Sequence, residues 1–141
     1  MDKAPWYHWP VAVVALVWTA IGAADYTLTQ YGAEFYLRSF TPDQIAYYRN
    51  LPLWIDGLWA IGVWAGLLGA ILMFTRSSLA ALVLGVSVVS LVLAAGWLLT
   101  LAEPSLWTIA GGQAATVMIV TIAVMACIYL YARQMHVEGV L

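Results

Sequence analysis

The chain has 141 residues, of which 65% are hydrophobic and 9% are charged. Soluble globular domains carry about 25% charged residues, so this composition excludes a water-facing surface over most of the chain and predicts a protein of the lipid bilayer. The net charge of −2 does not indicate a nucleic-acid partner, and a single cysteine excludes an intrachain disulfide.

Four apolar runs are each long enough to cross a hydrocarbon core of about 30 Å as a helix. They predict spans over residues 10–29, 51–74, 79–100 and 106–132. Together these spans predict one transmembrane domain, residues 1–141, that is all-α and forms an antiparallel bundle of four transmembrane helices. The expected first span has small residues along one face and carries Asp25 near its end.

The loop over residues 30–50 is the only sizeable connection between spans. Within it, Thr41-Pro42-Asp43-Gln44 has an N-cap residue, a proline at the first helical position and glutamine three residues after the cap. This order is a capping box, so it predicts a short interfacial helix over residues 42–49.

The second span contains one charge, Asp56, one helical turn from Trp59. Its glycines Gly62, Gly66 and Gly69 fall within a narrow arc, which predicts a surface where another helix approaches closely. We interpret this glycine surface as a helix-packing face and as the candidate interface of a homo-oligomer.

Four spans place both termini on one side of the membrane. That side has Lys3, Arg76 and Arg133, whereas Arg38 and Arg49 lie on the other side among acidic residues. The positive-inside rule therefore favours cytoplasmic termini.

The polar residues of the spans gather toward the membrane face opposite the termini. Since a charge inside the bilayer costs at least about 2.5–3.5 kcal/mol, such residues usually face the bundle interior and find partners. We therefore predict a ligand-binding cup in which the acids have the two loop arginines as counter-ions and two aromatic side chains as walls. Its members are Asp25, Asp56, Glu103, Gln113, Tyr26 and Trp59, with Arg38 and Arg49 as counter-ions.

A structural role is the alternative for each polar member of this cup. Asp56 can pair with Arg49 or Tyr26 and hold the loop down, and Asp25 can act as a cap or in an ion pair near the membrane edge. Glu103 precedes a proline in a turn, where it can be exposed, and Gln113 can form an interhelical hydrogen bond.

Catalytic and metal-binding motifs are not evident in the sequence. His8 and His136 both belong to the side of the termini, away from the acids, so neither a Ser-His-Asp arrangement nor zinc or haem ligand spacing can be proposed. We therefore expect a protein that is not an enzyme, with no cofactor and no metal.

Four stretches together resemble a family of small four-span bacterial inner-membrane proteins, often labelled "sugar transporter". They are GAADYTLTQ, FTPDQIAYY, LPLWIDGLWAIGVWAGLLGA and YARQMHVEGVL, and they cover nearly the whole chain in order. The resemblance implies a four-helix membrane fold in the bacterial inner membrane.

Two functions follow from these observations. The first is binding or transport of a small, sugar-like solute in the polar cup, by an oligomer, because four spans are too few for a gated pathway. The second is an accessory or structural subunit of a larger membrane complex, in which Asp25 and Asp56 only anchor the loop. The expected partners are the lipid bilayer and either further copies of the chain or other membrane subunits.

Overall fold

The structure is a computed structural model that describes residues 4–30, 38, 40–101 and 106–141, without the side chains of residues 106, 107, 110, 113 and 114. All regular structure in these ranges is helical. The elements are α1 (His8–Gln30), α3 (Pro42–Arg49), α4 (Leu53–Phe74), α5 (Ala80–Gly96), the π-helix η1 (Trp97–Leu101) and α6 (Leu106–Val137).

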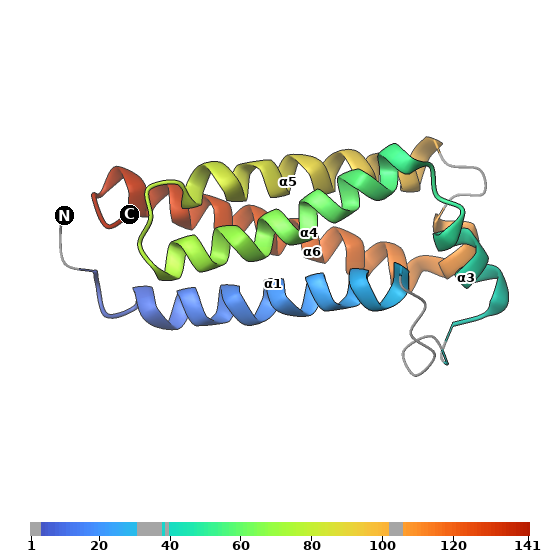
Figure 1. Cartoon of the computed structure of the whole chain (residues 1–141), viewed down its shortest axis with the longest axis horizontal. Coiled ribbons are helices and arrows are strands. Elements are labelled where there is room, and N and C mark those ends of the chain that lie inside the picture. The colour runs from blue at the N-terminus through green and yellow to red at the C-terminus, as the bar shows by residue number, and fades with distance from the viewer. Residues whose placement is uncertain (1–3, 31–37, 39, 102–105) are drawn as a thin grey trace.

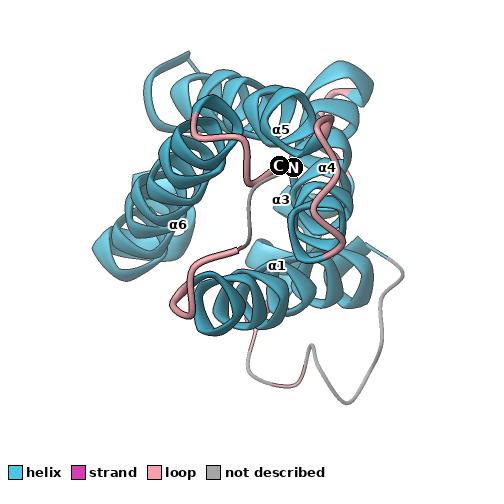
Figure 2. Ribbon diagram, turned by 90° about the vertical axis from the view of Figure 1, so that its left-hand side faces the viewer, coloured by secondary structure: helices cyan, strands magenta, loops and turns pink. Residues whose placement is uncertain are grey.

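Four helical segments of the described chain are long and apolar enough to cross a membrane: His8–Gln30, Leu53–Phe74, Ala80–Leu101 and Ala115–Val137. They run side by side as a helix bundle, in which α4 packs against α1 and α5, and α5 packs against α6 (Figures 1 and 2). The described termini lie at one end of this bundle and α3 lies at the other (Figure 1). Large aliphatic side chains such as Val14, Ile21 and Leu82 are exposed on its outside, as expected for contact with lipid.

The glycine surface of α4 is buried against α5 of the same chain. A Cβ atom added to Gly62 would lie 2.6 Å from Leu91 Cδ2, and one added to Gly69 would lie 2.6 Å from Leu84 Cγ. The Ser87 hydroxyl donates a hydrogen bond of 2.5 Å to the Gly62 carbonyl oxygen. The surface is therefore used within one chain, and it is not free to form the oligomer interface that we assigned to it from the sequence.

Helix α6 is interrupted at Gly111, whose φ of 76° and ψ of −178° are not helical. A positive φ favours glycine, because a Cβ atom would clash with the backbone there. The expected span over residues 106–132 thus begins with a short helical piece before the break, and the long apolar helix extends to Val137.

Helix α3 is held to α6 next to this break. The capping box predicted from the sequence is present: Gln44 N donates to Thr41 Oγ1, and Thr41 N donates to Gln44 Oε1, both at 3.2 Å. The remaining Gln44 Nε2 donates to the Ile109 carbonyl oxygen at 3.3 Å. Since the break at Gly111 disturbs the helical hydrogen bonds nearby, the Gln44 amide supplies a donor where the backbone ladder is interrupted.

Candidate functional site

Asp56 lies in the first turn of α4, where its backbone N–H donates to the Pro52 carbonyl oxygen at 3.0 Å. The positive end of the helix dipole favours a carboxylate at this position. The side chain is half-buried, so the Asp56 carboxyl group remains partly accessible at the start of α4.

Tyr26 of α1 joins Asp56 to an aromatic side chain. The Tyr26 hydroxyl donates to Asp56 Oδ1 at 3.0 Å, and its ring meets the edge of Trp59 with a centroid distance of 4.9 Å. Three members of the predicted cup, from two helices that are consecutive spans, therefore lie together.

The aromatic contacts continue from Trp59 into the loop. Tyr48 of α3 lies 5.9 Å from Trp59 between ring centroids, and Tyr47 and Phe40 lie 5.8 Å and 6.0 Å from Tyr48. The Gln30 side-chain amide donates to the Tyr48 carbonyl oxygen at 3.5 Å. Tyr48 was not among the predicted members of the cup, although its place in the predicted short helix put it near the same membrane face.

Asp25 lies on α1 beside Tyr26 and is exposed in part. Its charge acts on Tyr48: burial raises the pKa of the Tyr48 phenol above its usual value, and the negative charges of Asp25 and then Tyr47 raise it further. Asp25 thus belongs to the same region as Asp56, on the loop side of the aromatic cluster.

A groove of about 610 Å³ runs between α1 and α4 beside this cluster; we call it the α1–α4 groove. Its lining residues are Tyr26, Thr27, Gln30, Asp56, Ala60 and Trp64. Asp56, Ala60 and Trp64 follow one another at four-residue spacing and so lie on one face of α4. The small Ala60 side chain leaves space between the acid and the indole, and this spacing is the signal by which the sequence could have pointed to the groove.

The two arginines predicted as counter-ions form no ion pair with Asp56, and the other two members of the predicted cup have side chains outside the description. Arg38 and Arg49 are both exposed, and the partner that the structure gives Asp56 is the Tyr26 hydroxyl. Glu103 lies outside the described residues. Gln113 belongs to α6 by its backbone, and its side chain lies outside the description.

His8 forms a polar site that the sequence analysis did not predict. The side chain is completely buried at the start of α1; its Nε2 lies 3.1 Å from the Met73 carbonyl oxygen and its Nδ1 lies 2.9 Å from the Tyr131 hydroxyl. A carbonyl only accepts, so Nε2 carries a hydrogen and donates to the Met73 carbonyl oxygen, and Nδ1 forms the hydrogen bond with the Tyr131 hydroxyl. This site ties α1, α4 and α6 together at the end of the bundle away from Asp56.

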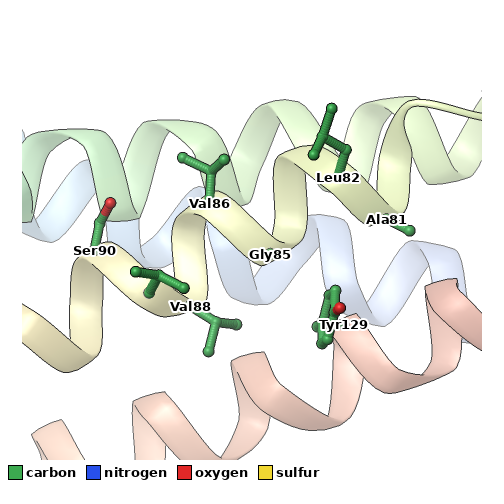
Figure 3. A pocket seen from close by; sticks show the side chains of 8 residues that line it. Ala81, Leu82, Gly85, Val86, Val88, Ser90 and Tyr129 are labelled. Atoms are coloured by element: carbon green, nitrogen blue, oxygen red, sulfur yellow. The ribbon is translucent and has the colours of Figure 1, made fainter.

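A second groove, of about 440 Å³, lies between α5 and α6 and is almost entirely apolar (Figure 3). Gly85 forms its floor beside Tyr129, and Ser90 is its one polar side chain from α5. Such a groove offers dispersion contacts and the hydroxyls of Ser90 and Tyr129, and its lining side chains carry no charge.

Comparison of the chain with protein-family models, with curated proteins and with solved structures finds no match in any of the three. Over the described residues, no three His, Cys, Asp or Glu side chains come together as a metal site. The α1–α4 groove is therefore the place where charge, aromatic rings and open volume coincide.

Proposed function

We propose that this protein is a multi-pass protein of the bacterial inner membrane, an antiparallel bundle of four transmembrane helices with cytoplasmic termini, that binds a small solute in the α1–α4 groove. The observation that supports this function most directly is the groove itself. It combines a carboxylate, a tyrosine hydroxyl, an amide and an indole with a volume within the usual range for small-molecule sites.

Transport of the bound solute would need a second chain. Four helices, one of them interrupted, leave no room for a pathway gated on both sides, so we propose that transport is carried out by an oligomer. Because α5 covers the glycine surface of α4, the oligomer must use a different face from the one expected from the sequence.

The test measures solute binding to the purified protein in lipid nanodiscs. It uses a variant whose larger side chain fills the groove and so blocks it for any solute. Ala60→Phe places a ring between Asp56 and Trp64 and is expected to abolish binding. Ile61→Phe, one residue further and on the exposed face of α4, is the matched control and is expected to bind normally. Equal binding by both variants would remove the groove from consideration.

The alternative function is that of an accessory or structural subunit of a larger membrane complex. The apolar groove between α5 and α6 supports it, since small residues there allow close approach of a helix from another chain. The native mass after gentle extraction separates the two functions. A small multiple of the mass of one chain supports a homo-oligomer, and other chains in fixed ratio support the subunit.

A further inference from the structure

The carboxylate in the α1–α4 groove lacks a cationic partner in the part of the chain that the structure describes. The Tyr26 hydroxyl that bonds to Asp56 is neutral, and Arg38 and Arg49 are exposed and form no ion pair with Asp56 within 4.0 Å. Residues 31–37, 39 and 102–105 contain neither lysine nor arginine. Arg76 donates to the Val140 carbonyl oxygen at 3.0 Å, Arg133 lies near the C-terminal end of α6, and Lys3 lies outside the described residues.

A charge at membrane depth is costly unless it is paired, and a hydroxyl hydrogen bond does not cancel it. Asp56 also lies at the positive end of α4, where the helix favours the ionised carboxylate. The ionised carboxylate of Asp56 in this groove would attract a positive ligand group and repel an anion.

The rest of the groove suits an apolar group attached to that positive charge. The carboxyl, hydroxyl and amide groups of its lining come from the end near α3, whereas Ala60 and Trp64 extend it toward the middle of α4. Eight residues of helix separate Asp56 from Trp64, a rise of about 12 Å. At the Trp64 end, the indole N–H is the one polar group among the lining side chains.

We propose that the α1–α4 groove binds an amphiphilic organic cation, with an amine or quaternary ammonium group at Asp56 and an apolar body along Ala60 toward Trp64. Tyr26 and Trp64 line the groove, and aromatic faces add cation–π attraction for such a group. This inference rests on the proposed solute-binding function and specifies the chemical class of its ligand.

The experiment compares three probes that share one apolar body. They are 4-phenylbutyl-trimethylammonium, 4-phenylbutyl β-glucoside and 4-phenylbutanesulfonate. Binding is measured by equilibrium dialysis in zwitterionic nanodiscs, with empty nanodiscs as the blank for partition into lipid. The cation is expected to bind at least tenfold more tightly than either other probe.

The variants locate the interaction. Asp56→Asn keeps an oxygen that can accept from Tyr26 and removes the charge, so the cation is expected to lose at least tenfold in affinity. Glu138→Gln removes a charge at the opposite end, where Glu138 bonds to Gln134, and is expected to bind as the parent does. The thermal unfolding of each variant shows that it is folded.

The outcomes separate the inference from the function on which it rests. Binding of the glucoside in preference to the cation, or cation binding that is unchanged in Asp56→Asn, overturns the cation inference and leaves solute binding standing. Failure of all three probes to bind the folded parent protein overturns both. Preferential binding of the cation that depends on Asp56 supports both.

Discussion

The buried histidine at the start of α1 acts as a joint between three helices. His8 uses both ring nitrogens, one toward the Met73 carbonyl of α4 and one toward the Tyr131 hydroxyl of α6, and its ring stacks on Tyr131 at 5.9 Å. Polar side chains that are fully satisfied inside a membrane protein fix the mutual position of helices.

His8→Leu keeps most of the side-chain volume and removes both hydrogen bonds. We expect the free energy of unfolding in mixed micelles to fall by about 1–3 kcal/mol. His136→Leu is the control, because His136 is exposed, and it is expected to change stability by less than about 0.5 kcal/mol. Equal stability of the two variants would contradict the role of His8 as a joint.

The Tyr47 hydroxyl is buried without a hydrogen-bond partner among the described residues, next to the apolar cluster of Ile55 and Leu98. Removing an unsatisfied buried hydroxyl is favourable, so Tyr47→Phe is expected to raise the free energy of unfolding by about 1 kcal/mol. Tyr47→Ala removes the ring as well and is expected to destabilise the protein. Chemical denaturation at neutral pH measures both.

Tyr47 also makes the free energy of unfolding depend on pH. Burial raises the pKa of its phenol above 10.0, so at high pH the unfolded chain releases this proton before the folded chain does. The stability of the folded chain is at its full value below the unfolded pKa of about 10 and falls as the pH rises through the pKa of the folded state. Tyr47→Phe is expected to lose less stability than the parent between about pH 9 and 11.

Only part of the candidate site could be predicted from residue types. Helical spacing placed Asp56 beside Trp59. The hydrogen-bond donor to Asp56, however, depends on how α1 packs against α4. For the same reason Trp64 and Gln30 were missed. The arginines were expected as counter-ions because charge alone pairs them with acids, whereas the structure shows that the Tyr26 hydroxyl is the nearer partner.

Among the elements, α4 and α5 form the closest pair because the glycines of α4 accept leucines of α5. Gly62→Ala and Gly69→Ala would each place a methyl group 2.6 Å from a leucine carbon. Each is expected to destabilise the folded chain by about 1–3 kcal/mol, since overpacking moves whole side chains.

Gly57→Ala is the control for these two variants. It lies on the same helix, and an added Cβ atom there would meet nothing within 4 Å. Alanine is the better helix former, so this change is expected to raise stability by about 0.5–1 kcal/mol. Loss of an oligomer without loss of stability in Gly62→Ala would contradict packing within one chain.

The link between α3 and the break in α6 can be tested by two changes at one residue. Gln44→Glu keeps an oxygen for the capping box and removes the donor to Ile109, whereas Gln44→Ala removes both. The hydrogen-exchange rate of the amides next to Gly111 is expected to rise about fivefold in both variants. This rise corresponds to a decrease of about 1 kcal/mol in the free energy of local opening. The amides of α3 are expected to exchange faster in Gln44→Ala only.

For the whole molecule, apolar length was enough to predict four helices that can span a membrane, because each run exceeds the thickness of the hydrocarbon core. The break in α6 was not predicted. Gly111 and Gly112 are compatible with a continuous helix, and only the positive φ at Gly111 distinguishes the two conformations.

The proposed orientation has a direct test in a Cys127→Ala background, where no other cysteine remains. Asp43→Cys on α3 is expected to react with a membrane-impermeant maleimide in intact cells with a permeabilised outer membrane. Ser78→Cys, between α4 and α5, is expected to react only after the inner membrane is opened. Both positions are exposed in the structure, so the opposite pattern would mean that the termini face outward.

The joint at His8 has a consequence for the order in which the bundle assembles. Its bond to Tyr131 connects positions 123 residues apart, so the start of the first span stays without this tie until the last span has been synthesised and inserted. Long-range closures of this kind form late, because the intervening chain must be ordered first. The α1 wall of the groove is therefore expected to reach its final position only at the end of biogenesis.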